Sequence, residues 1–561
     1  MTMFQVLRKE KIALDMGFLY VFALWYGFFF CNLGTWPVKI LVMIIGYWIG
    51  SRRDLRVEIA LGHVLLSIAF VSMYVLLSLP NLRNSVNGDH WYHIQSAYEK
   101  ILAIVYAEQG ALHTYAVRDI LQFASAIMLV LTLAAHQLYK SRPYWSISLL
   151  LGLGIYLYNS YPVAGYVDPH PVLRGLPVLF SGVAGVDSFG FRIQGFLAIF
   201  CLVLWLSLRV WPLKQKLLLI VFSLSIPLVY FTAPLVEFSI WACVMLTVFF
   251  IRIVDEEELT DRDLVVFGMS FVMAGMIRQT MLFGFATLLL YCFLQKRYKS
   301  LCQCLLIGVP VYFQIFNARH LINPAAYVPD EKFLNVPTHL GLLERVLYSM
   351  QPVNLQAVLA STGLSLLGLV LIGFIILGVK ERYRIAAVLA LAAVFSWVLF
   401  HAIRPILWGV PRYQSEYIVP LSLAGATLLL REFKKAGGLC LAALALFNVV
   451  LIVQFYDVMP SRVPDYPEWS SGKTPYLSEL PFNVDEALKK TFDGCGDSVY
   501  FDGTTYGNFP VIFAGVSLHR YLKISQVRPE EARCVYHLYP QHISGGFFNA
   551  QRNSTVVLEK R

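Results

Sequence analysis

Long apolar runs, separated by short polar segments, occupy most of the chain up to residue 456. A helix needs ~20 apolar residues to cross a membrane, and fewer where it packs among other helices, so these runs predict about 15 crossings. The predicted spans lie near residues 13–31, 34–50, 57–79, 116–138, 146–160, 189–209, 217–232, 236–251, 264–277, 279–295, 301–317, 356–379, 384–402, 415–430 and 437–456.

The polar triplet Arg278-Gln279-Thr280 interrupts an apolar run that is too long for one straight crossing. We interpret the triplet as a tight turn between two spans. The alternative is one tilted helix with a buried arginine, which would reverse the sidedness of every later segment.

Residues 89–113 form a polar segment between two apolar runs. Ile94, Ala97, Ile101 and Ile104 recur at the three-to-four spacing of one helix face, which predicts an amphipathic helix in the membrane interface. Asp89 stands at the start of this helix. There it could serve chemistry, or it could only cap the helix by accepting hydrogen bonds from backbone N–H groups.

The apolar runs stop after residue 456. Residues 457–561 have ordinary polarity and contain the β-like runs SVYFDG, PVIFAGVSLHRYL, RCVYHLYP and STVVLEK. We therefore predict an all-α polytopic membrane domain over 1–456, followed by a small α/β domain over 457–561 outside the membrane.

Composition agrees with a membrane protein, because 58% of the residues are hydrophobic and only 14% are charged. The net charge of +10 does not indicate nucleic-acid binding, since Lys and Arg fall in short clusters between apolar runs. With a cytoplasmic N-terminus, the positive-inside rule accounts for most of these clusters. They lie in the predicted inside loops 51–56, 139–142, 209–216, 251–262, 294–299, 380–384 and 431–435.

Most of the nine cysteines lie in or beside apolar runs, where thiols behave as small core hydrophobes. Cys495 and Cys534 alone lie in the polar C-terminal segment. If that segment faces an oxidising compartment, the two could form a disulfide, although the spacing does not establish the pairing.

Ionisable residues gather on the predicted outer face. Acids and imidazoles near the membrane boundary are unfavourable in hydrocarbon, so they are candidates for function. Arginines at the outer ends of spans could grip the phosphate of a lipid-linked donor. The candidates are Asp89, His90, Asp168, His170, Arg174, Glu237, Arg278, Arg404, Arg412 and Tyr413.

The order of these motifs resembles the GT-C glycosyltransferases, which include protein O-mannosyltransferases, aminoarabinose transferases and oligosaccharyltransferases. An acid in the first large outer loop precedes an in-plane helix. The segment DPHPVLRGLPVLFSGVAGVDSFGFRIQGFL is similar to a motif of the family-39-like branch, and PRYQSEYIVP is similar to its later Arg-Tyr motif. The resemblance covers roughly residues 57–430, as layout and short motifs rather than continuous identity.

The resemblance implies roles for these residues. Asp89 matches the acid that acts as general base on the acceptor, while His90 departs from the family's common acid-acid pair. Asp168 and His170 match a second-loop motif that binds a divalent cation in some relatives, so a cation site with Asp89 is possible; D-P-H-P is also a good turn without any ligand.

Arg412 and Tyr413 match the motif near the donor phosphate, which the resemblance implies they bind. The alternative for Arg412 is an interfacial arginine that snorkels to the headgroup level. Besides the possible divalent cation, no cofactor is expected.

The predicted function is transfer of a sugar from a polyprenyl-phosphate donor to a lipid, glycan or protein acceptor on the exoplasmic face. One alternative is a lipid-linked sugar flippase or transporter, against which we find no inverted repeat. Others are a glycan ligase or polymerase, and a noncatalytic assembly subunit. The expected location is a bacterial inner membrane with a periplasmic C-terminal domain; an endoplasmic reticulum enzyme would show the same pattern.

Overall fold

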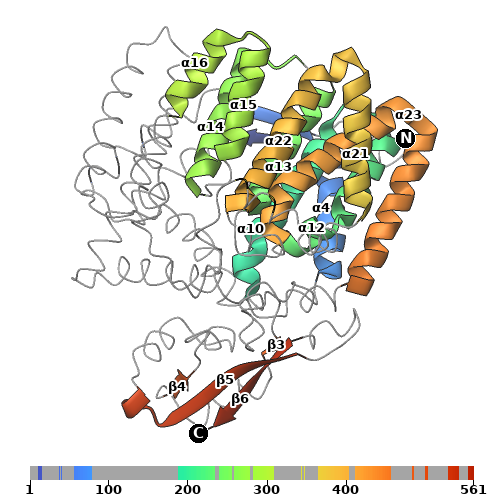
Figure 1. The fold of residues 1–561 in the computed structure, drawn as a ribbon. Helices are drawn as coiled ribbons and strands as arrows, with labels where there is room; N and C mark the ends of the chain where they lie inside the picture. Colours follow the sequence, from blue (N-terminus) through green and yellow to red (C-terminus); the bar gives the residue numbers. More distant parts are fainter. Residues whose placement is uncertain are drawn as a thin grey trace.

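The computed structural model describes eight main stretches within residues 1–456 and four further ones within residues 457–561. The former are residues 11–15, 56–78, 188–233, 239–255, 258–277, 282–308, 364–403 and 411–455. The latter are 483–484, 499–502, 529–542 and 554–560, and single helical positions are described at 37, 40, 44, 343 and 347. Most of the described residues are helical (Figure 1).

The helices coincide with the predicted spans that the structure describes, because their sequences are almost wholly apolar. The bounds are α4 Leu61–Leu77, α10 Ser188–Leu208, α11 Leu213–Ser225, α12 Pro227–Thr232, α13 Ser239–Val254, α14 Asp261–Ile277, α15 Leu282–Leu294, α16 Tyr298–Ile307, α21 Leu364–Val379, α22 Arg384–Ile403 and α23 Pro411–Phe455. The predicted spans 34–50, 116–138 and 146–160 and the amphipathic helix 89–113 lie outside the described ranges, apart from single positions in 34–50.

Two helical stretches, Glu381–Phe400 and Gln414–Ile452, are long and apolar enough to cross a membrane. Five shorter apolar helices accompany them, at Leu61–Leu77, Gly195–Leu208, Ile240–Val254, Phe283–Leu294 and Gly368–Val379. By length and composition, the described bundle therefore has the character of a membrane-associated protein.

The helices break where local chemistry requires it. Ile226 is extended and separates α11 from α12, since a proline at position 227 disfavours helical backbone at the residue before it. Within α23, Lys434 has φ 44° and ψ −107°, so the helix folds back on itself there. Its two arms correspond to the predicted spans 415–430 and 437–456.

The chain reverses direction between α14, which ends at Ile277, and α15, which begins at Leu282, while the triplet Arg278-Gln279-Thr280 itself lies outside the described residues. The two helices are antiparallel: Arg297, just after α15, pairs with Glu258 and with Asp261 at the start of α14. The single tilted helix is therefore wrong.

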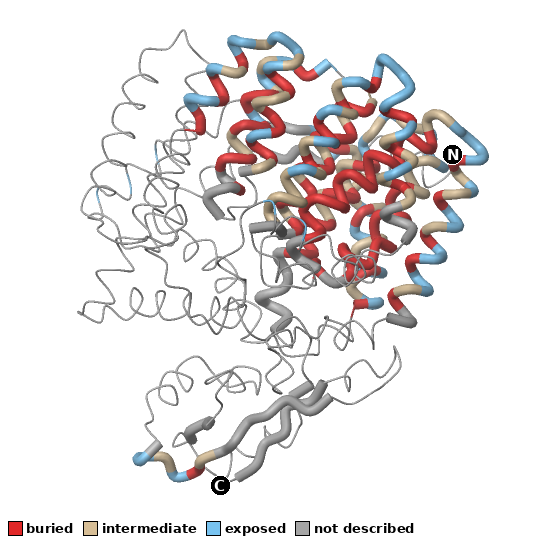
Figure 2. The backbone as a smooth tube through the Cα atoms, viewed as in Figure 1, coloured by how far each residue is buried: buried red, intermediate tan, exposed pale blue. Residues whose placement is uncertain are grey.

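The helix α13 and the first arm of α23 form the centre of the bundle. Both contribute residues to the two clusters of buried hydrophobic side chains, one on each side of them. Figure 2 shows these buried positions, while exposed positions follow the second arm of α23. In the first cluster, the ring of Phe249 meets Phe267, Phe271 and Tyr291 edge-on, with centroids 5.2–5.9 Å apart.

Close helix packing depends on glycine at a few positions. A Cβ added to Gly425 would lie 2.8 Å from the Leu369 carbonyl oxygen of α21, and one added to Gly373 would lie 3.5 Å from the Gly425 Cα. Small residues at such crossings let helix backbones approach each other, which increases dispersion contacts.

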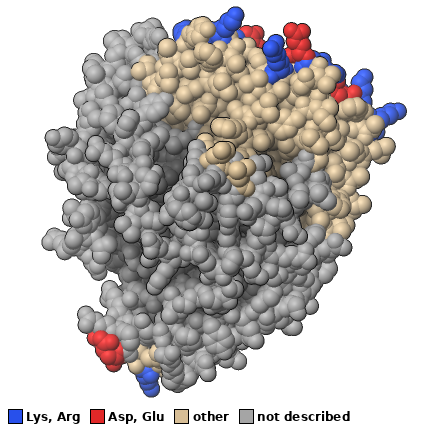
Figure 3. Space-filling model, in the orientation of Figure 1, with Lys and Arg blue, Asp and Glu red and all other residues tan. Residues whose placement is uncertain are grey.

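Charged side chains gather at one end of the bundle, which we call the charged end (Figure 3). Ion pairs join its loops: Arg209 pairs with Asp255 at 2.7 Å, and Arg252 pairs with Asp263 at 3.0 Å. Glu432 is bound by Lys380 and Arg382 and accepts a hydrogen bond from Tyr383 Oη at 2.6 Å. Five predicted inside loops, 209–216, 251–262, 294–299, 380–384 and 431–435, meet here.

Asp263 also caps α14. The Thr260 backbone N–H donates to its carboxylate at 2.9 Å, while the Asp263 N–H donates to Thr260 Oγ1 at 3.2 Å, forming a reciprocal capping box. Burial opposes ionisation of this carboxyl, but hydrogen bonds from Arg252 and Thr260 outweigh that effect and lower the pKa of Asp263 to about 2.

The described structure also contains strands. β1 (Lys11–Asp15) pairs antiparallel with β2 (Arg56–Ala60), so the predicted spans 13–31 and 57–79 begin too early and the described part of residues 1–456 is not all-α. The β-branched residues Ile12, Val57 and Ile59 favour this pairing, and Lys11 Nζ pairs with Glu58 at 2.7 Å.

The C-terminal segment contains a mixed four-stranded sheet of order β3-β6-β5-β4. The strands are β3 Asn483–Val484, β4 Val499–Asp502, β5 Cys534–His542 and β6 Ser554–Lys560, and a 3-10 turn covers Pro529–Glu531. Three of the predicted β-like runs are thus strands. Cys534 is disulfide-bonded, whereas Cys495, with which the sequence allowed it to pair, lies outside the described residues.

We expect Gly425→Leu to destabilise the bundle by about 1–3 kcal/mol, because the new side chain must displace the α21 backbone. Thermal unfolding of the detergent-solubilised protein measures this. Gly368→Leu is the matched control, since a Cβ there meets nothing within 4 Å. Equal melting temperatures for the two variants would contradict the packing described here.

The lowered pKa of Asp263 predicts a pH dependence. A carboxyl with a depressed folded-state pKa stabilises the protein above its unfolded pKa of about 3.9, and loses this contribution as pH falls toward 2. The stability gap between wild type and Asp263→Asn should be roughly 1–2 kcal/mol at neutral pH and close between pH 4 and about 2. For the control Glu381→Gln, which alters an exposed acid, the stability difference from wild type should not change over this pH range. If the stability difference between wild type and Asp263→Asn were also constant, the lowered pKa of Asp263 would be refuted.

Candidate functional site

The end of the bundle opposite the charged end collects aromatic and polar side chains. Trp397 Nε1 of α22 donates a hydrogen bond to Gln414 Oε1 of α23 at 2.7 Å. The Tyr417 ring lies 5.0 Å from that of Phe283 at the start of α15, and 6.4 Å from that of Phe400. The start of α23 thus packs against the end of α22 and the start of α15. We call this region the α23 end.

Three consecutive polar residues are buried at the α23 end. Gln414 and Ser415 are fully buried, and Glu416 is only 1% exposed, with both carboxylate oxygens inaccessible to solvent. Glu416 also interacts electrostatically with the Cys243 thiol of α13. An acid buried within an apolar helix is costly unless its surroundings compensate it, so Glu416 is a candidate functional residue.

Pro420 changes the hydrogen bonding of a backbone carbonyl at the same place. Proline has no backbone N–H, so Pro420 cannot donate the helical hydrogen bond to the carbonyl of the residue four positions earlier, which is Glu416. Residue 416 therefore combines a buried carboxylate with a carbonyl that cannot accept the usual hydrogen bond from position 420. Inside a helix bundle, neighbouring groups or a local change of helix geometry normally satisfy such a carbonyl.

Two of the predicted site residues can be placed. Arg412 and Tyr413 lie in the first turn of α23, which begins at Pro411, immediately before the buried stretch Gln414–Glu416. The Arg-Tyr motif and the buried acid thus belong to the same two turns of helix.

The other predicted site residues lie outside the described ranges. Three of them adjoin helix ends that the structure does describe: Glu237 comes two residues before α13, Arg278 directly follows α14, and Arg404 directly follows α22. These helix ends are remote from the charged end. The remaining predicted residues are Asp89, His90, Asp168, His170 and Arg174.

The possible divalent-cation site stays a prediction, since Asp89, Asp168 and His170 are not described. Within the ranges that the structure describes, no group of three His, Cys, Asp or Glu side chains could hold a metal ion.

Glu416 is the functional candidate that sequence reasoning missed. Its signal was available: an acid lies inside the predicted span 415–430, shortly after an Arg-Tyr motif and four residues before a proline. A mean hydropathy taken over a window of residues conceals a single buried acid such as Glu416, because its apolar neighbours dominate the mean.

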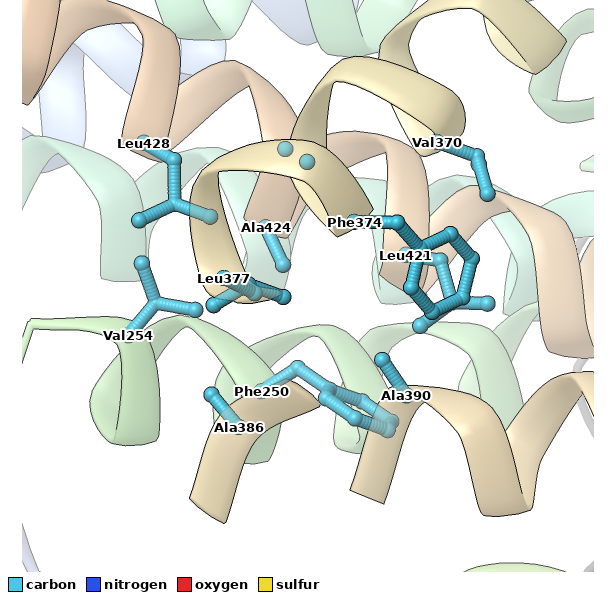
Figure 4. Close-up of a pocket in the computed structure, with 12 residues that line it drawn as sticks. Phe250, Val254, Val370, Phe374, Leu377, Ala386, Ala390, Leu421, Ala424 and Leu428 are labelled. Carbon is cyan, nitrogen blue, oxygen red and sulfur yellow. The ribbon is translucent and has the colours of Figure 1, made fainter. Parts of the chain in front are cut away.

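A recess between α13, α21, α22 and α23 is lined by apolar residues and glycines alone (Figure 4). Phe250, Phe374 and Leu421 lie among its walls, and Val254 and Leu377 lie toward the charged end. Since it offers no polar group to orient a substrate, the recess is not the candidate site.

The chain matches no family model, no curated protein and no solved structure.

Proposed function

We propose that the protein is a polytopic membrane glycosyltransferase that moves a sugar from a polyprenyl-phosphate donor to an acceptor at the α23 end. The observation that carries the proposal is the position of the Arg-Tyr motif. Arg412 and Tyr413 begin the helix whose next residues form a buried polar stretch, at the end of the bundle remote from the charged loops. A lipid-linked phosphate needs this combination of cations and a sheltered polar site.

Two observations support an exoplasmic site. The basic loops at the charged end fit the cytoplasmic side under the positive-inside rule, which leaves the α23 end outside. The disulfide-bonded Cys534 fits an oxidising compartment. In this proposal the C-terminal segment is periplasmic in a bacterial inner membrane, or lumenal in an endoplasmic reticulum.

In the proposed reaction, Asp89 removes the proton from the acceptor hydroxyl or amine as the nucleophile attacks the sugar carbon. The bond between that carbon and the phosphate oxygen breaks, and the polyprenyl phosphate leaves with the bonding electrons. Arginines at the α23 end, including Arg412, stabilise the charge that develops on this oxygen.

Glu416 has a positioning role in this proposal. It stands one helical turn after Arg412, the spacing at which a carboxylate and a guanidinium on one helix pair. A carboxylate held rigidly by burial would keep the guanidinium directed toward the donor, which matters because small errors in placement slow group transfer strongly.

Asp89→Asn should abolish sugar transfer while leaving donor binding largely intact, because the amide cannot accept the acceptor's proton. Membranes would be incubated with a panel of radiolabelled polyprenyl-phosphate sugars, following both lipid cleavage and label transfer. Glu99→Gln, on the polar face of the same predicted helix, is the control. Full activity of Asp89→Asn at equal expression would remove this residue from the mechanism, and lipid movement without cleavage would indicate a flippase.

Glu416→Gln should lower kcat by about tenfold to a hundredfold with a small change in melting temperature, because the side chain keeps its shape but loses its charge. Glu416→Asp should recover part of the rate. Glu381→Gln, at the charged end, should be fully active. If Glu416→Gln loses stability but keeps its rate per folded molecule, the residue is only structural.

A further inference from the structure

Nearly all the acids described at the charged end are matched by cations. Asp255 and Asp263 pair with arginines, Asp261 accepts a hydrogen bond from Ser300 Oγ at 2.7 Å, and Glu258 pairs with Arg297. Glu432 is bound by two cations. Of the acids described at this end, only Glu381 has no partner within the described ranges.

Several exposed cations at the same end have no acidic partner among the described residues. They come from all five loops: Lys214, Arg262, Lys296, Arg384, Lys434 and Lys435. Glu256 and Glu257 lie outside the described ranges, and even counting both of them with Glu381, the acids are fewer than these cations. The charged end therefore presents a surplus of positive charge (Figure 3).

Exposed apolar side chains stand beside these cations. Leu213 adjoins Lys214, Tyr298 follows two residues after Lys296, and Phe433 adjoins Lys434; all three are exposed. Positive charge alone would be enough to bind a water-soluble acidic partner, which has no need of exposed apolar groups. Cations alternating with exposed apolar and aromatic groups instead fit the boundary between headgroups and acyl chains.

Two of the surplus lysines occupy backbone positions that favour glycine. Lys296 has φ 56° at the end of α15, where the Arg297 N–H bonds the Cys292 carbonyl at 2.8 Å, as in a Schellman cap. Lys434 has φ 44° at the turn within α23. A side chain is strained in this region, so its presence at both turns points to a use for the positive charge there.

We propose that the charged end binds the phosphate headgroups of anionic phospholipids in the adjacent leaflet, with Lys296 and Lys434 as principal contacts. An ammonium group at the membrane surface attracts such headgroups, and the attraction weakens as salt increases. This inference is independent of the proposed glycosyl transfer.

The test uses the purified full-length protein in vesicles of phosphatidylcholine with spin-labelled phosphatidylglycerol or spin-labelled phosphatidylcholine. The fraction of motionally restricted label gives the relative association constant of the two lipids. The wild type should prefer phosphatidylglycerol several-fold in about 0.05 M salt and lose most of this preference in about 0.5 M salt. Equal association of the two lipids, or a preference that salt leaves unchanged, would overturn the proposal without any variant.

Variants separate charge from backbone conformation. The double variant Lys296→Gly, Lys434→Gly should lose most of the preference while its melting temperature in phosphatidylcholine stays equal or rises, since glycine relieves the strain. Lys296→Gln, Lys434→Gln should lose the preference equally without that rise. The control Lys473→Gln, Lys523→Gln, which removes two charges from the C-terminal segment, should keep it. An unchanged preference in the glycine variant, or an equal loss in the control, would refute the assignment.

Discussion

The cost of placing charge among apolar helices is the constraint on which this structure depends. Within the described helices, nearly all charged side chains stand at one end, where carboxylates meet guanidinium and ammonium groups. The ion pairs at this end join the end of α10 to that of α13, α13 to α14, the start of α14 to the end of α15, and the connection between α21 and α22 to the middle of α23. They are partly exposed, so each contributes little stability by itself. Their larger effect is to fix which helix ends lie together at the charged end. The opposite ends of the same helices then meet at the α23 end, where a polar site can form. The other end holds few charged residues, Arg192 and Arg412 among them, and Glu416 is the acid that is buried there.

Much of the helical framework could be predicted from the sequence, because a long apolar run leaves the backbone few alternatives to a helix. The spans around Trp397 and Leu421 and the break at Arg278 follow from hydropathy and one polar triplet. The pairing of Lys11–Asp15 with Arg56–Ala60 could not be predicted, since strand pairing joins residues far apart in sequence, and both strands border apolar runs that hide them.

The candidate site was less predictable than the fold. Short motifs located Arg412 and Tyr413 at the start of a span, and the structure places them in the first turn of α23. They did not locate Glu416, whose importance arises from burial against α13, a helix more than a hundred and fifty residues earlier in the chain. The roles assigned to Asp89, Asp168 and His170 remain predictions from the resemblance, because a fold or a layout alone does not determine chemistry.

The central contact between α13 and the first arm of α23 has a consequence for biosynthesis. Residues 239–254 are synthesised long before residues 411–433, yet each helix is the main packing partner of the other. Until α23 arrives, the buried face of α13 must be covered by lipid, by neighbouring helices or by a chaperone. The bundle can therefore reach its final packing only near the end of translation. A chain that ended before α23 would lack a helix from the centre of the bundle rather than one from its periphery.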